Sequence, residues 1–230
     1  MKCGESDKRN AIFKENYSDE EFLKKQIKTN RPLILDIGAH IGESVLFFRS
    51  IFPNADIFSV EPDPDSYIRL LKLFPNIDKC INAAVGKKTE VRTLYQYDIP
   101  HLNSLHSINK DSNDSLGYAQ SCSETEVKVN CLSLDDLVKK LNISGQSIDL
   151  LKIDTQGGEV DVLLGGSDTL NQVQNITLEL NLFDFYSRKN SFLEIESLLP
   201  EFELYSITKL SQNPINYRTD WAEVFYKRIG

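Results

Sequence analysis

A glycine-containing turn is the first feature of the sequence that suits ligand binding. Residues 36–42 read Asp-Ile-Gly-Ala-His-Ile-Gly and lie between a predicted strand at 33–38 and a predicted helix at 43–52. Glycine allows a sharp turn and lets a ligand approach the backbone without obstruction by a side chain. In open α/β sheets, a turn at the carboxyl end of a strand borders the ligand crevice. We therefore predict a ligand site formed by Asp36, Gly38, Ala39 and Gly42.

The chemistry of this turn discriminates between adenosine cofactors. Its glycines are spaced Gly38-x-x-x-Gly42, unlike the G-x-G-x-x-G pattern that cradles a pyrophosphate, and Asp36 would repel such a group. S-adenosylmethionine (SAM) carries an ammonium and a sulfonium and no phosphate, so it suits an acidic turn better. Glu61 follows the next predicted strand and can accept hydrogen bonds from ribose hydroxyls, a device shared with dinucleotide enzymes. The turn favours SAM, and an NAD-dependent oxidoreductase or epimerase is the alternative.

A second group of polar residues follows the predicted strand at 148–154. Asp154 ends that strand beside the predicted crevice, and the following residues bring Gln156 and Glu159 to the same mouth. Aspartate is also a favoured helix N-cap, a role that is compatible with substrate contact. Glu179 lies near the end of the next predicted strand, where it either contacts a substrate or is solvated. We predict a substrate site at these strand ends.

His106 is the only histidine that we consider for catalysis. It falls with Ser104 in a polar loop at 100–120, which is too long for a simple connection, and long loops often bind ligands. The alternative is that His106 is merely exposed, as isolated loop histidines often are. Oxygen and imidazole ligands from His106, Asp154 and Glu179 would suit magnesium or manganese. Nothing in their spacing requires a metal, and none is predicted.

Strands and helices alternate along the chain at the spacing of β-α-β units. Strands are predicted at 33–38, 56–61, 80–85, 148–154 and 175–181, with helices at 43–52, 65–74 and 134–141. Two strand-like runs at 90–97 and 125–131 predict a hairpin with an acceptor loop, inserted at 86–133. A helix near 191–199 and strands at 202–210 and 222–227 follow, and residues 1–30 have the apolar spacing of a helical lid. The sequence predicts one α/β domain over 1–230, with a doubly wound Rossmann-like sheet.

The composition narrows the range of partners. The 230 residues carry 26 basic and 34 acidic side chains, a formal net charge of -8, so the usual basic surface for DNA or RNA is not predicted. Four cysteines without a C-x-x-C pair fit a reducing cytoplasm and signal neither zinc nor disulfides. No apolar run has the length of a membrane span, and the N-terminus has no signal-peptide core. We expect a cytoplasmic protein with a small-molecule substrate.

Five segments in order along the chain resemble the FkbM family of SAM-dependent methyltransferases. They are DIGAHIG at 36–42, EPDP at 61–64, NAAVG at 82–86, SLH at 104–106 and IDTQGGE at 153–159. The segments span about half of the chain, and their order is more specific than any one of them. The resemblance implies a seven-stranded, mostly parallel sheet with an antiparallel last strand and helices on both faces.

The resemblance also implies residue roles and a reaction. The implied cofactor contacts are Asp36, Gly38, Ala39, Gly42, Glu61, Pro62, Asn82 and Ala83. The implied reaction transfers a methyl group to a hydroxyl oxygen of a small metabolite, such as a sugar or a nucleotide-activated sugar. The predicted substrate contacts are Ser104, Gln156, Glu159 and Glu179.

An alcohol reacts only when its proton leaves, so a general base is expected. We predict His106 as this base, with Asp154 orienting the imidazole or positioning the hydroxyl, and Asp154 itself as the alternative base. A catalytically silent protein that keeps the fold as an interaction module is a further alternative. The sequence predicts no oligomeric state.

Overall fold

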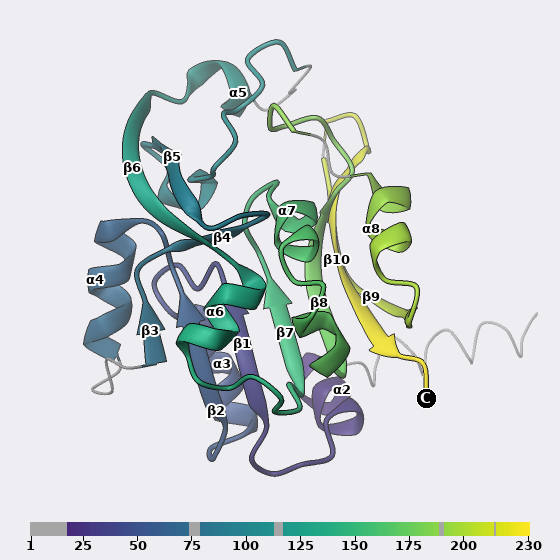
Figure 1. The fold of residues 1–230 in the computed structure, drawn as a ribbon. Helices are drawn as coiled ribbons and strands as arrows, with labels where there is room; N and C mark the ends of the chain where they lie inside the picture. Colours follow the sequence, from purple (N-terminus) through teal and green to yellow (C-terminus); the bar gives the residue numbers. More distant parts are fainter. Residues whose placement is uncertain (1–17, 74–78, 113–116, 189–190, 214) are drawn as a thin grey trace, which may run out of the picture.

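A seven-stranded sheet forms the centre of the structure, a computed structural model that describes residues 18–73, 79–112, 117–188, 191–213 and 215–230 (Figure 1). In spatial order its strands are β3 (Cys80–Ile81), β2 (Asp56–Val60), β1 (Leu33–Ile37), β7 (Leu150–Ile153), β8 (Asn175–Asn181), β10 (Thr219–Arg228) and β9 (Phe202–Gln212). Neighbouring strands are parallel, except that β10 is antiparallel to both β8 and β9. The predicted doubly wound α/β fold with an antiparallel last strand is confirmed.

Helices cover both faces of this sheet. On one face lie α2 (Asp19–Gln26), α3 (Glu43–Ile51) and α4 (Pro64–Leu73). On the other lie α6 (Leu134–Lys140), α7 (Glu159–Leu164) and α8 (Phe192–Leu198), which stand in front of the sheet in Figure 1. The connections hold α5 (Tyr118–Ser121) and the short 3-10 helices Pro100–Leu102 and Thr169–Gln172.

The central strand β1 explains how polar groups enter the core. All five of its residues are buried, as expected for a parallel sheet that is covered on both faces. Because side chains alternate along a strand, Leu35 and Ile37 pack towards α6 and α7, whereas Ile34 packs towards α3. Asp36 shares the face of Ile34, and the strand register pairs it with Lys152 of β7. Two opposite charges therefore meet inside the sheet.

The insertion at 86–133 forms a second sheet, of order β4-β6-β5. Its strands are β4 (Ala84–Gly86), β5 (Glu90–Tyr97) and β6 (Glu124–Ser133). Strands β5 and β6 pair antiparallel, as the predicted hairpin requires, and β4 adds a parallel neighbour to β6.

The single strand predicted at 80–85 is wrong, because the chain changes sheets between β3 and β4. The change occurs at Asn82, whose side-chain amide donates to the carbonyls of Glu61 at 2.9 Å and Pro62 at 3.2 Å. These bonds tie the crossing to the end of β2. The flanking residues of both strands are apolar, so the sequence pattern shows no break.

Helix α2 is the part of the predicted N-terminal lid that the structure describes, since residues 1–17 lie outside the described residues. The hydroxyl of Ser18 caps it by accepting a hydrogen bond from the backbone N–H of Glu21 at 3.4 Å. Leu23 is buried in the same apolar cluster as Phe225 of β10. None of the helices in the described residues is long and apolar enough to cross a membrane.

Candidate functional site

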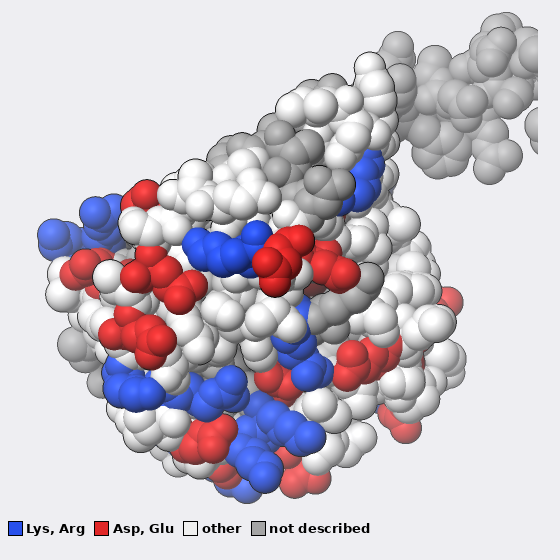
Figure 2. All heavy atoms as spheres, turned by 90° about the horizontal axis from the view of Figure 1, so that it is seen from above, with Lys and Arg blue, Asp and Glu red and all other residues white. Residues whose placement is uncertain are grey.

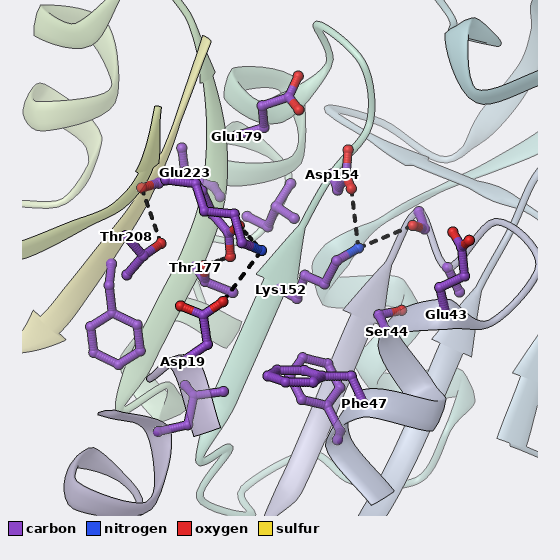
Figure 3. A pocket seen from close by; sticks show the side chains of 18 of the residues that line it. Asp19, Glu43, Ser44, Phe47, Lys152, Asp154, Thr177, Glu179, Thr208 and Glu223 are labelled. Carbon is purple, nitrogen blue, oxygen red and sulfur yellow. Dashed lines mark hydrogen bonds and ion pairs between the residues drawn. The ribbon is translucent and has the colours of Figure 1, made fainter. Parts of the chain in front are cut away.

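Two adjoining cavities lie at the carboxyl ends of the parallel strands. The larger, of about 440 Å³, lies between α2, α3 and the face formed by β7, β8 and β10, and we call it the sheet-face cavity (Figure 3). The smaller, of about 170 Å³, lies between the ends of β1 and β2, the loop at 100–106 and the start of α7, and we call it the strand-end cavity. Both are lined by Gly38, His40, Glu43 and Asp154. Acidic and basic side chains are interspersed over the molecular face above these strand ends (Figure 2).

The turn after β1 fits closely against the end of β7. Gly38 has a positive φ of 77°, and a Cβ atom at this position would overlap the carbonyl oxygen of Asp154. Gly42 also has a positive φ, of 96°, and begins α3. Because only glycine accepts these angles without strain, the two glycines predicted from the sequence bring the turn to the boundary between the cavities.

Lys152 neutralises the acidic groups beneath this turn. Its Nζ lies 3.1 Å from Oδ1 of Asp36 and 3.5 Å from Oδ2 of Asp154, and it donates to the carbonyl of Gly38 at 3.1 Å. Burial by itself would lower the pKa of Lys152, but the two carboxylates raise it above the ordinary value, so the ammonium stays charged. Asp36 is fully buried, accepts a hydrogen bond from Ser44 and lines neither cavity. Asp36 therefore lies beneath the turn, and its expected cofactor contact stays a prediction.

Glu61 lies at the floor of the strand-end cavity, at the end of β2. Its carboxylate accepts hydrogen bonds from the backbone N–H groups of His40 and Asp63, each at 2.8 Å. Only 6% of the residue is exposed, and this burial raises the pKa of Glu61 to about 7. Each carboxylate oxygen has a second lone pair, so the group can still accept hydrogen bonds from a ligand. An adenosine ribose would present two hydroxyl donors to such an acceptor.

Glu159 holds the loop after β7 in shape. Its Oε1 accepts hydrogen bonds from the backbone N–H of Thr155 at 2.9 Å, from the Thr155 hydroxyl at 3.1 Å and from the N–H of Gly157 at 3.3 Å. The residue is fully buried, and burial raises its pKa to about 7. Glu159 lines neither cavity, and its hydrogen bonds go to its own loop, so its substrate contact stays a prediction.

Gln156 links this loop to Asp154 and to two other segments. It has a positive φ of 54°, which is uncommon for a residue other than glycine. Its side-chain amide donates to Asp154 at 3.0 Å and accepts from the hydroxyl of Tyr186 at 2.8 Å. The hydroxyl of Ser104 donates to the Gln156 carbonyl at 2.6 Å. These bonds hold Asp154 at the boundary between the cavities.

His106 reaches the strand-end cavity but is oriented by Asp161 rather than by Asp154. The Nε2 of His106 lies 3.4 Å from Oδ2 of Asp161 in α7, and the other Asp161 oxygen lies 3.6 Å from Arg188. The close contact with His106 is the main cause of a lowered pKa at Asp161. His106 therefore has a carboxylate partner, but a different one from that predicted.

Glu179 of β8 faces the sheet-face cavity. Its carboxylate accepts a hydrogen bond from the side chain of Asn181 at 3.3 Å, and it stands apart from the ion pairs in Figure 3. Burial, followed by the negative charges of Asp154 and Glu159, raises the pKa of Glu179 to about 8. In the same cavity, Lys209 lies 2.8 Å from Glu223 and 3.8 Å from Asp19.

The predicted residues divide between the two cavities. Predicted residues that line the strand-end cavity are Gly38, Glu61, Pro62, Ala83, Ser104, His106, Asp154 and Gln156. Those that line the sheet-face cavity are Gly38, Ala39, Asp154 and Glu179. Asp36, Gly42, Asn82 and Glu159 line neither and support the surrounding backbone. Among the described residues, no group of three potential metal ligands is close enough to hold an ion.

Sequence reasoning missed the residues that hold the predicted ones in place. They are Lys152, Asp161 and Tyr186. Sequence reasoning also missed the ion pair of Lys209 with Glu223, which lines the sheet-face cavity. Lys152 lies inside a strand, where the sequence pattern indicates only core. The others meet their partners through contacts between distant segments, for which a single sequence carries no signal.

Comparison with known proteins identifies the family. Residues 36–206 match the model of the methyltransferase FkbM domain, so the chain belongs to this family and is a methyltransferase. A 2-O-methyltransferase, NoeI, from Sinorhizobium fredii is 29% identical over 179 residues, covering 75% of this chain and 73% of that protein. Methyltransferase sdnD from Sordaria araneosa is 26% identical over 191 residues, covering 73% of each chain.

A solved structure agrees with the fold. The crystal structure of a methyltransferase FkbM from Methylobacillus flagellatus superimposes with a TM-score of 0.52 and 14% identity. The match covers 86% of this chain and 44% of that one, so this chain spans less than half the length of that protein. The likeness supports the Rossmann-like sheet.

Proposed function

We propose that this methyltransferase uses SAM to methylate a hydroxyl oxygen of a small acceptor such as a sugar or a nucleotide-activated sugar. The observation that carries the proposal is the meeting of two different cavities at Asp154. One cavity contains a buried carboxylate that suits a ribose, and the other is wider and lined by hydroxyl groups, carboxylates and aromatic rings. The 2-O-methyltransferase among the relatives supports oxygen as the acceptor atom.

The strand-end cavity suits the adenosine part of SAM. Glu61 supplies the acceptor for the ribose hydroxyls, while Pro62 and Ala83 supply apolar walls for a base. The turn at Gly38 has no side chain to obstruct the methionine part. Bound SAM would supply an electrophilic methyl group at the boundary of the cavities.

The sheet-face cavity suits a polyhydroxylated acceptor. Hydroxyl groups of Ser44, Thr177 and Thr208 line it together with carboxylates, and these groups can exchange hydrogen bonds with an acceptor's hydroxyls. Phe47 and Trp221 add apolar surface against which a sugar ring can pack. The cavity volume of about 440 Å³ is within the range of small-molecule sites, roughly 300–1,000 Å³.

In this arrangement Asp154 is the better placed general base. Asp154 borders both cavities, whereas His106 borders only the strand-end cavity. An acceptor in the sheet-face cavity would bring its hydroxyl to Asp154, which is held by Lys152 and Gln156. Asp154 would take the hydroxyl proton as the oxygen attacks. We therefore assign the base to Asp154 and a cofactor-side contact to His106, which reverses the preference that the sequence alone suggests.

Ligand binding tests the cofactor assignment. S-adenosylhomocysteine at a hundredfold excess over its dissociation constant should stabilise the protein by about 2.7 kcal/mol in thermal unfolding. NAD should have no effect, because the turn after β1 lacks the pyrophosphate pattern. Stabilisation by NAD alone would refute the proposal. Tight S-adenosylhomocysteine binding without methyl transfer to any acceptor would instead favour a catalytically silent protein.

A further inference from the structure

The sheet-face cavity contains more negative charge than its own lysines neutralise. Five carboxylate residues line it: Asp19, Glu43, Asp154, Glu179 and Glu223. Its two lysines, Lys152 and Lys209, are each already shared by two carboxylates. SAM would bring one net positive charge to the neighbouring cavity, which leaves carboxylates in excess. The chemistry of the cavity thus favours a positively charged ligand.

Two carboxylates of this cavity form no ion pair with a lysine or arginine of the described residues: Glu43, whose side chain is largely exposed, and Glu179, which is shielded from solvent. The hydrogen bond that Glu179 accepts comes from the neutral amide of Asn181. Lys152 is the cation that lowers the pKa of Glu179, but its ammonium lies between Asp36 and Asp154. A half-buried carboxylate that is largely shielded from solvent is costly unless it is protonated or paired. A ligand cation would supply the missing partner.

Aromatic rings in the same cavity point to the same ligand class. Phe22 of α2, Phe47 of α3 and Trp221 of β10 line it on different sides. Aromatic faces attract ammonium groups through cation–π interactions, and tryptophan attracts them more strongly than phenylalanine does. Carboxylates together with aromatic rings are therefore suited to binding an organic ammonium group. A neutral sugar would need only the hydroxyl groups of the cavity and one apolar surface for its ring.

We propose that the acceptor of this methyltransferase carries a protonated amino group, as in an amino sugar, and that Glu179 binds that group. This inference rests on the proposed function, because it treats the sheet-face cavity as the acceptor site. The ammonium pairs with Glu179 and thereby orients the molecule, which leaves a hydroxyl on the same molecule free to face Asp154. Glu179 is a specificity residue in this arrangement, and Asp154 keeps the role of base.

Binding of matched sugars tests the inference. The enzyme is saturated with S-adenosylhomocysteine, and calorimetry measures its affinity for D-glucosamine, D-glucose and N-acetyl-D-glucosamine from slightly acidic to slightly basic pH. This range is needed because the amine must be protonated while Glu179, whose pKa is raised to about 8, must be ionised. The sugars are compared at the pH of tightest glucosamine binding. Glucosamine should bind at least about tenfold more tightly than either neutral sugar. In Glu179→Gln, which keeps the side-chain shape, this preference should disappear. In the control variant Glu126→Gln, which changes an exposed residue of β6, the preference for glucosamine should remain.

Other results of this experiment would contradict either the inference or the proposed function. Equal affinities in the wild-type protein, tighter binding of the neutral sugars, or no binding of glucosamine at tens of millimolar would overturn the inference. A preference that persists in Glu179→Gln would overturn the role of Glu179. Failure to bind S-adenosylhomocysteine in the first step would instead refute the proposed function. The wild-type comparison does not depend on the folding of any variant.

Discussion

Replacing Glu61 tests the cofactor site most directly, and the structure decides which replacement to use. The carboxylate already accepts the backbone N–H groups of His40 and Asp63. Glu61→Ala would leave both groups without a partner, at about 1–3 kcal/mol each, a large part of the roughly 5–15 kcal/mol that stabilises a typical domain. The alanine variant would therefore confuse lost binding with lost folding.

Glu61→Gln is the cleaner change. The amide keeps an accepting oxygen for one of the two backbone N–H groups and sets a donor against the other, so it leaves one group unpartnered where alanine leaves two. Hydrogen bonds from the ribose to a charged acceptor are lost. Such bonds contribute about 1.5–3 kcal/mol, which corresponds to roughly 10- to 150-fold weaker binding. Calorimetric titration with S-adenosylhomocysteine measures this loss, and thermal unfolding of the ligand-free variant checks that it is folded.

Glu126→Gln provides the matched control, because it makes the same chemical change at an exposed position of β6. Its affinity for S-adenosylhomocysteine should equal that of the wild-type protein. A folded Glu61→Gln variant that also binds with wild-type affinity would remove Glu61 from the cofactor site. The assignment of the strand-end cavity to adenosine would then fail with it.

Three further results are expected. If Asp154 is the base, Asp154→Asn should lower turnover by about 10²- to 10⁴-fold with cofactor affinity retained, and wild-type turnover by this variant would refute the assignment. The melting temperature of the ligand-free protein should fall as the pH rises from about 4.5 to 7. The reason is that Glu61 and Glu159 keep their protons up to about pH 7 in the folded state but lose them near pH 4.5 in the unfolded state. A melting temperature that does not change over this range would contradict the raised pKa values. Gly38→Ala should abolish S-adenosylhomocysteine binding or folding, since its Cβ would overlap a backbone carbonyl, and wild-type binding by this variant would contradict the close approach of the turn to the end of β7.

The sequence predicts the sheet well because its signals are local. Apolar runs ended by glycine or acidic residues mark β1 and β2, and the alternation with helices fixes the parallel topology. The same local signals fail at 80–85, where one apolar run serves two sheets. Strand identity there depends on which neighbour each half meets, and a single sequence does not encode that partner.

Local sequence signals also predict where the site residues lie better than they predict where their side chains point. Strand ends predict which residues lie near the crevice, and Glu61, Asp154 and Glu179 do line the two cavities. Strand ends do not predict where a side chain points, and the carboxylate of Glu159 turns inwards to bind its own loop. Sequence reasoning offers Asp154 as one possible partner for His106, but the loop that carries the histidine approaches α7, and His106 lies next to Asp161.

Lys152 shows why the whole sheet is needed to form the site. Within its strand it looks like an interruption in a buried apolar run, yet the register between β1 and β7 places it beside Asp36. That buried carboxylate holds the ammonium, and the ammonium in turn holds Asp154 at the boundary between the two cavities. A buried charge left without its partner is strongly destabilising, so Asp36 and Lys152 are coupled to each other and Asp154 to both. The position of the proposed base therefore depends on the pairing of two strands whose residues lie more than a hundred positions apart in the sequence.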